Sequence, residues 1–203
     1  MNELVATLLE QARAYSAPEA LAVVLAVLYL VLAIRQNIWC WFCAGISTMI
    51  FAWLFFSVAL YMEAALNIFY FAMAVYGWSQ WWDKGAAREG QRPVVAWPMR
   101  VHVNAILAVV ALSAVSGYLL ATHSDAAFPY VDSLTTWGAV WATFLVARKV
   151  LENWWYWLVI DTTMVYVFWA KDLELAALLY VLYVFLIPIG LLSWKRSYRE
   201  SRV

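Results

Sequence analysis

Seven long apolar stretches constrain this chain more than any other feature. A helix of about 20 apolar residues crosses the hydrocarbon core of a bilayer. Hydrophobic residues make up 67% of the chain and charged residues 13%, against roughly 45–50% and about 25% in a soluble domain. The sequence therefore predicts an all-α integral membrane protein, one membrane domain over 1–203. Its seven transmembrane helices are expected at about 19–34, 38–59, 61–82, 101–122, 132–147, 151–170 and 172–193.

The two ends of the chain lie outside these stretches. Residues 1–17 place Leu4, Leu8 and Ala12 at helical spacing, which predicts a short amphipathic helix at the membrane interface. Glu3 and Glu10 are atypical of a secretory signal, which begins with basic residues. Residues 194–203 form a basic tail.

Lysine and arginine are distributed unevenly over the two ends of the predicted bundle. Eleven fall at one end and only two, Arg13 and Lys171, at the other. Because cytoplasmic loops carry the excess of positive charge, we expect the N-terminus outside and the C-terminus in the cytoplasm. The eleven are Arg35, Lys84, Arg88, Arg92, Arg100, Arg148, Lys149, Lys195, Arg196, Arg199 and Arg202.

An internal repeat relates the two halves of the sequence. Asn37, Trp39 and Trp41 recur 116 positions later, as Asn153, Trp155 and Trp157. A second set recurs 113 positions later: Leu60, Ala64, Tyr70, Gly77 and Trp81 match Leu173, Ala177, Tyr183, Gly190 and Trp194. The pattern predicts three-helix repeats at 19–82 and 132–193 that run in the same direction, joined by a linker helix at 101–122. Parallel repeats are a transporter design with the substrate site near the midplane.

Asp161 is the strongest candidate for a functional residue. It lies midway along the sixth stretch, where a carboxylate costs roughly 2.5–3.5 kcal/mol to insert and should face the bundle interior. Trp154 and Trp157 share its helix face, followed by Met164 and Phe168. Two indoles and a carboxylate suit a flat, cationic ring. The alternative is that the tryptophans pack in the core and Asp161 bonds a neighbouring hydroxyl.

Other polar and aromatic residues extend this candidate substrate site. Asn67 and Tyr70 lie one turn apart on the third stretch, where they would bond either a ligand or another helix. The remaining candidates are Trp137 and Trp141 on the fifth stretch and Tyr180 on the seventh.

Several function classes are excluded or disfavoured. A net charge of zero gives no sign of a nucleic-acid partner. Cys40 and Cys43 are interpreted as packing residues, and His102 and His123 lie at opposite ends of one helix, so we expect no metal and no cofactor. No catalytic motif is present, so we expect no enzyme. A retinal photoreceptor would need a lysine within 172–193, which has none.

Three motifs resemble signatures of a known family. They comprise Leu60, Tyr61, Asn67, Tyr76, Gly77, Trp78 and Trp81; then Phe128, Pro129, Asp132 and Ser133; then Ala147, Arg148, Lys149, Glu152, Asn153, Trp154 and Trp157. From about residue 30 to 196 the chain resembles the PnuC vitamin transporters. The resemblance implies a SWEET-like arrangement of three, one and three helices in the bacterial inner membrane. It also implies facilitated diffusion of an unphosphorylated vitamin that a cytoplasmic kinase then traps; homo-oligomer formation is left open.

Departures from the family pattern bear on the substrate. Members that carry nicotinamide riboside tend to have Gln where this chain has Asn67, and Asn where it has Ala74 and Asp161. A carboxylate suits thiamine, which has both a permanent positive charge and an aminopyrimidine. The expectation is therefore a thiamine transporter similar to the relatives called PnuT. Nicotinamide riboside and riboflavin are alternatives, and a cation or proton channel is the alternative from another class.

Overall fold

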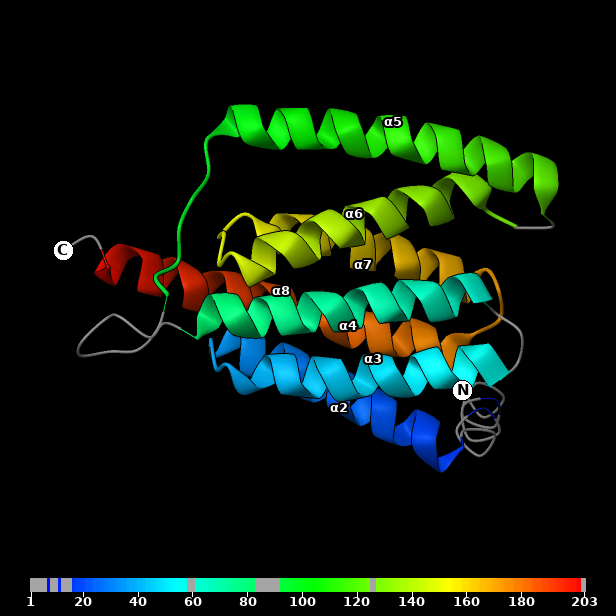
Figure 1. Ribbon diagram of the computed structural model, residues 1–203, viewed down its shortest axis with the longest axis horizontal. Coiled ribbons are helices and arrows are strands. Elements are labelled where there is room, and N and C mark those ends of the chain that lie inside the picture. Colours follow the sequence, from blue (N-terminus) through cyan, green and yellow to red (C-terminus); the bar gives the residue numbers. More distant parts are fainter. Residues whose placement is uncertain are drawn as a thin grey trace.

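The computed structural model describes residues 7, 11, 16–57, 61–82, 92–124 and 127–201. The predicted interfacial segment 1–17 therefore lies almost entirely outside the described residues. Within them the fold is all-helical, and each predicted span is a helix (Figure 1). The helices are α2 (Ala17–Ile34), α3 (Trp39–Ser57), α4 (Tyr61–Trp81), α5 (Met99–His123), α6 (Pro129–Ala147), α7 (Asn153–Trp169) and α8 (Glu174–Glu200).

Local sequence explains where these helices begin and end. Ser16 caps α2 through a reciprocal capping box with Glu19. Three helix ends close with a residue in the left-handed region, at Gln36, Lys149 and Asp172, with φ between 53° and 55°. In each, the next residue's N–H reaches back to a carbonyl five positions earlier, as in Asn37 to Leu32. These Schellman turns satisfy carbonyls that the helix leaves unpaired.

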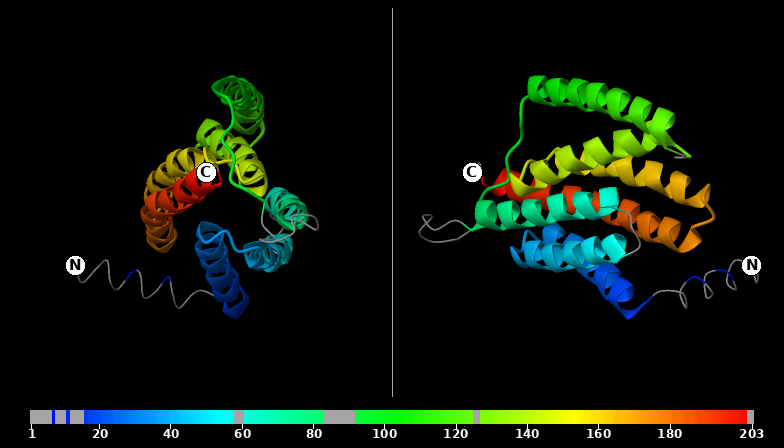
Figure 2. Two further views of the ribbon diagram at one scale, coloured as in Figure 1. Left: turned by 90° about the vertical axis from the view of Figure 1, so that its left-hand side faces the viewer. Right: turned by 45° about the vertical axis from the view of Figure 1, so that its right-hand side comes forward.

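Six helices form a closed ring, and the seventh lies outside it. Around the ring α2 contacts α3, α3 contacts α4, α4 contacts α6, α6 contacts α7, α7 contacts α8, and α8 returns to α2. α5 packs on the outer side of α6, as the end-on view of Figure 2 shows. The halves α2–α4 and α6–α8 thus run in the same direction, as the parallel repeat predicts.

Four helices, α2, α3, α5 and α8, are long and apolar enough on their own to cross a membrane among the described residues. α4, α6 and α7 carry polar residues that face the centre of the ring, including Asn67, Thr135 and Asp161. They cross the membrane as members of the ring, where these polar groups face the enclosed space instead of lipid.

The structure corrects the spacing of the repeat. Trp41 packs against Gly77, and Trp154 packs against Gly190 in the same way, so closely that a Cβ on either glycine would overlap the indole. Trp154 is therefore the counterpart of Trp41, and the spacing is 113 positions throughout. The predicted 116-position match of Trp41 with Trp157 is wrong, because the tryptophan-rich segments also match when shifted by one helical turn.

Candidate functional site

The ring of six helices encloses a cavity of about 660 Å³. This volume lies within the range of small-molecule sites, roughly 300–1,000 Å³. A second hollow of about 600 Å³ lies between α3 and α4, and apolar and aromatic residues such as Ile46, Met49 and Val75 line it. None of the described residues that line the second hollow is charged, so the central cavity is the candidate functional site.

Asp161 provides the deep negative charge of the central cavity. It lies midway along α7, is 5% exposed and lines the cavity. Tyr180 and Tyr183 of α8 line the same space and lie close enough to interact electrostatically with its carboxylate. Within the described part of the chain, no hydrogen bond or ion pair satisfies this carboxylate. A buried acid without a partner is available to a ligand.

Aromatic side chains form much of the wall around Asp161. Trp154 is buried at one end of the cavity, whereas Trp157 is half-buried on the same helix face. The Tyr180 ring lies 5.2 Å from that of Phe168. The entire predicted α7 stripe of Trp154, Trp157, Asp161, Met164 and Phe168 therefore lines one space.

Six of the eight predicted site residues line this cavity. They are Trp154, Trp157 and Asp161 from α7, Asn67 and Tyr70 from α4, and Tyr180 from α8. The structure brings these six together, and their contact with a substrate stays a prediction.

The structure places Trp137 and Trp141 outside the cavity. The Trp137 indole N–H donates to Ser116 Oγ of α5 at 3.2 Å. The Trp141 ring packs 6.1 Å from Trp97 and 5.7 Å from Phe144. α6 turns Thr135, Thr136 and Ala139 toward the cavity instead. Residues 137 and 141 lie on the opposite face of that helix.

Several residues that line the cavity could not be recognised as site residues from the sequence. Tyr29 of α2 and Phe51 and Phe55 of α3 line the cavity but lie within apolar stretches that suit lipid equally well. Glu19 lines the end of the cavity at the first turn of α2. Among the described lining residues there is no Lys, Arg or His. The cavity therefore carries acidic groups and suits a cation.

Comparisons with known proteins agree with this architecture. The family model described as nicotinamide mononucleotide transporter matches residues 16–196. The chain is 26% identical to the nicotinamide riboside transporter PnuC of Escherichia coli (strain K12), over 90% of this chain and 86% of that protein. It is 29% identical to the riboflavin/roseoflavin transporter RibM of Streptomyces davaonensis, over 88% and 85% of the two chains. The crystal structure of the vitamin B3 transporter PnuC superposes with a TM-score of 0.70 at 21% identity, over 97% and 90%.

Proposed function

Because this chain belongs to the nicotinamide mononucleotide transporter family, which includes the PnuC proteins, we propose that it carries an unphosphorylated, positively charged vitamin across the membrane. The first candidate is nicotinamide riboside. The chain is a vitamin transporter and not an enzyme. The observation that carries the proposed substrate is the Asp161 carboxylate inside an aromatic cavity, to which no described residue gives a hydrogen bond or ion pair.

The charge of the cavity supports a cationic substrate without a phosphate. A positively charged ring next to Asp161 supplies the counter-charge that the described residues do not. Trp157 and the tyrosines add cation–π contacts, worth up to about 2 kcal/mol in a dry site. A phosphate would bring about −1.5 to −2 charges into a cavity whose described lining has no basic residue.

The choice among vitamins rests on charge and on the relatives. Nicotinamide riboside is a permanent cation, and the E. coli relative carries its name. Riboflavin has a neutral ring, so it leaves Asp161 without a counter-charge. Thiamine is the second candidate, because its permanent charge and its amine could both meet the carboxylate. The relatives reported above are not named for thiamine, so the similarity to thiamine carriers stays a prediction.

The proposed mechanism is facilitated diffusion with alternating access. The vitamin stacks on Trp157, Asp161 offsets its charge, and Asn67 and Tyr70 orient it. The two halves then rock about the site and open it to each side in turn. We propose that the basic end of the bundle faces the cytoplasm of a bacterial cell, where a kinase traps the product. This orientation places the N-terminus outside.

Binding titrations test the proposed substrate directly. Nicotinamide riboside, thiamine, riboflavin and nicotinamide mononucleotide are titrated into the purified protein, followed by tryptophan quenching and calorimetry. We expect nicotinamide riboside to bind tightest and Asp161→Asn to weaken it by at least tenfold. Asp132→Asn is the matched control, since Asp132 lies outside the cavity and pairs with Lys171 at 3.9 Å.

Three results would contradict parts of this proposal. If the native protein and Asp161→Asn bind nicotinamide riboside equally well, the Asp161 carboxylate does not contribute to binding. Tight binding of thiamine alone would keep the transport role and the site but replace the vitamin. Single-channel currents in planar bilayers would favour the channel alternative over a carrier.

A further inference from the structure

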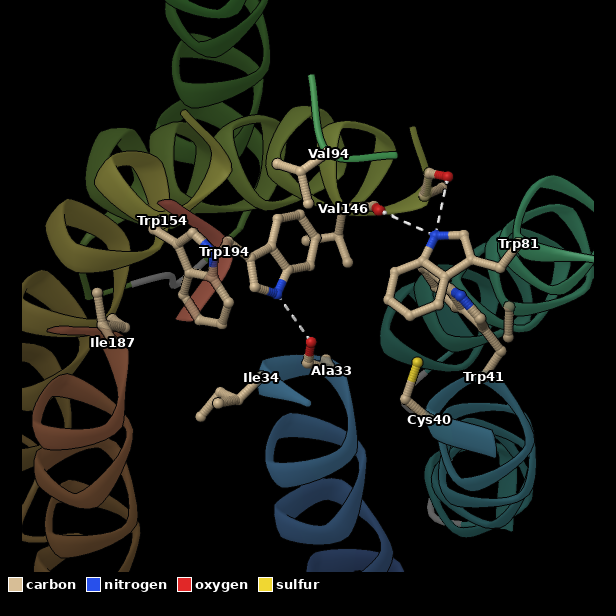
Figure 3. Close-up of a cluster of buried hydrophobic side chains, with 12 residues drawn as sticks. Ala33, Ile34, Cys40, Trp41, Trp81, Val94, Val146, Trp154, Ile187 and Trp194 are labelled. Atoms are coloured by element: carbon tan, nitrogen blue, oxygen red, sulfur yellow. Dashed lines mark hydrogen bonds between the residues drawn. The ribbon is translucent and has the colours of Figure 1, made fainter. Parts of the chain in front are cut away.

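Four tryptophans meet where the two halves join at the basic end of the bundle (Figure 3). Each half contributes one pair. Trp41 and Trp81 lie edge to face at 5.5 Å and 87°, and Trp154 and Trp194 repeat this geometry at 5.5 Å and 89°. The pairs touch through Trp81 and Trp194, whose rings are 6.1 Å apart. All four are 3% exposed or less. We call this group the tryptophan seam.

Reciprocal hydrogen bonds tie the halves together across the seam. The Trp194 indole N–H donates to the carbonyl of Ala33, near the end of α2, at 2.9 Å. The Trp81 indole N–H donates to Ala147 at 3.1 Å and Val146 at 3.3 Å, at the end of α6. Ala33 and Val146 are themselves 113 positions apart. Each half therefore binds the last turn of a helix in the other half.

A third tie joins equivalent positions of the two halves. Lys149 Nζ donates to Gln36 Oε1 at 3.3 Å, and both residues adopt the left-handed backbone of their helix ends. The Lys149 ammonium also lies 4.5 Å from the centroid of the Trp81 ring, within range of a cation–π contact. Each of these side-chain hydrogen bonds therefore joins a residue of the first half to a residue of the second half.

The seam separates the cavity from the basic end of the bundle. Ala33, Val146 and Ile187 belong to the same buried cluster as the four tryptophans, and these three residues and Trp154 also line the cavity. For a substrate to leave by this end, the two halves must part here.

Three buried polar groups at the seam lack partners. No hydrogen bond from the described residues reaches Trp41 Nε1, Trp154 Nε1 or Asn153 Oδ1. An unpaired buried polar group is destabilising, and water would satisfy it. The closed seam therefore contains groups that gain hydrogen bonds when it opens. This differs from a permanent core, in which buried polar groups are paired.

From these contacts we infer that the tryptophan seam is the gate that closes the cavity at the basic end, and that opening breaks the Trp81 and Trp194 bonds together. The inference rests on the proposed alternating access. It does not depend on which vitamin is carried.

Cys40 offers a native reporter of this gate. It is a free cysteine in the buried hydrophobic cluster that contains the four seam tryptophans, and it is 0% exposed. In a Cys43→Ala background, a membrane-impermeant methanethiosulfonate is applied to oriented vesicles from each side. The double variant Trp81→Phe/Trp194→Phe keeps both rings but loses both N–H donors. From the basic end, we expect Cys40 to be labelled about tenfold faster in this double variant than in the Cys43→Ala parent. From the other end, we expect the two proteins to be labelled at the same rate.

A matched control isolates the hydrogen bonds. Trp155→Phe changes an indole that is 56% exposed and lies outside the seam, so Cys40 labelling should stay at the native rate. Unchanged labelling in a folded double variant would overturn the gate, and so would faster labelling from the opposite end. If the proposed vitamin is wrong, the labelling rates will not change, and the error will be detected only in the binding titrations.

A cross-link provides a second test should the double variant fail to fold. Gln36→Cys and Lys149→Cys are joined by a short bis-maleimide in a Cys40→Ala/Cys43→Ala background. We expect the linked protein to bind its vitamin and to lose uptake in proteoliposomes. Native uptake by the linked protein would overturn the gate.

Discussion

Gly77 and Gly190 occupy equivalent positions in the two halves, and replacing each by alanine tests whether the halves are built alike. A glycine-to-alanine change in a helix interior ordinarily stabilises by up to about 1 kcal/mol. Here a Cβ would overlap the indole of Trp41 or Trp154. Overpacking of this kind costs about 1–3 kcal/mol, and more where the neighbour cannot move. Both indoles are nearly fully buried, at 2% exposure, so they cannot move aside without displacing the seam.

Because the indoles cannot move, the cost lies near the upper end, about 3 kcal/mol, and the helix-propensity gain offsets up to about 1 kcal/mol of it. The expected net destabilisation is therefore about 2 kcal/mol for Gly77→Ala and the same for Gly190→Ala. At roughly 2–4 °C per kcal/mol for a chain of this size, Tm should fall by several degrees in both. Thermal unfolding in detergent, followed by tryptophan fluorescence, measures this fall.

Gly45→Ala is the control for this pair. A Cβ at Gly45 would lie 3.7 Å from the nearest atom of Phe71, an ordinary contact. Its Tm should stay level or rise. A fall in only one of Gly77→Ala and Gly190→Ala would refute the equivalence of the two halves, and a rise in both would refute the close packing.

Three further predictions concern separate parts of the molecule. Burial lowers the pKa of Lys149 to about 8 from 10.5, so the native state binds fewer protons than the unfolded state between these pH values. Stability should therefore rise over that range by roughly 3 kcal/mol, and Lys149→Met should abolish the rise in plots of Tm against pH. Trp157→Ala should weaken vitamin binding by about tenfold in the titrations, whereas Trp137→Ala should leave it unchanged because that indole faces α5. Ser16→Ala removes the α2 cap and should cost about 1 kcal/mol, measured as a lower Tm with unchanged binding.

Helix number and the α7 face could be predicted from the sequence, because both depend on local signals. Apolar length decides which stretches span a bilayer. A central carboxylate such as Asp161 must turn inward whatever its neighbours are. These constraints do not depend on how the helices pack.

The face of α6 and the α2 wall could not be predicted, since lipid and protein interior are equally apolar. Trp137 and Trp141 are large and aromatic, but α6 turns its small residues to the cavity and its tryptophans to α5 and the loop before it. Tyr29 lies in an unbroken apolar run and still lines the cavity. The spacing of the repeat likewise could be assigned only from the Trp41–Gly77 and Trp154–Gly190 contacts in the structure.

The constant spacing of 113 positions also sets the charge at the centre of the bundle. The counterpart of Asp161 in the first half is Thr48, whose hydroxyl is occupied by the carbonyl of Ala44 at 2.8 Å. Two copies of the second half would place two carboxylates around a two-fold axis, where they would repel. Two copies of the first half would place none. Only the fused, unequal pair presents a single carboxylate at this level of the bundle, midway along α7, so a monovalent cation has one orientation in which its charge meets that carboxylate.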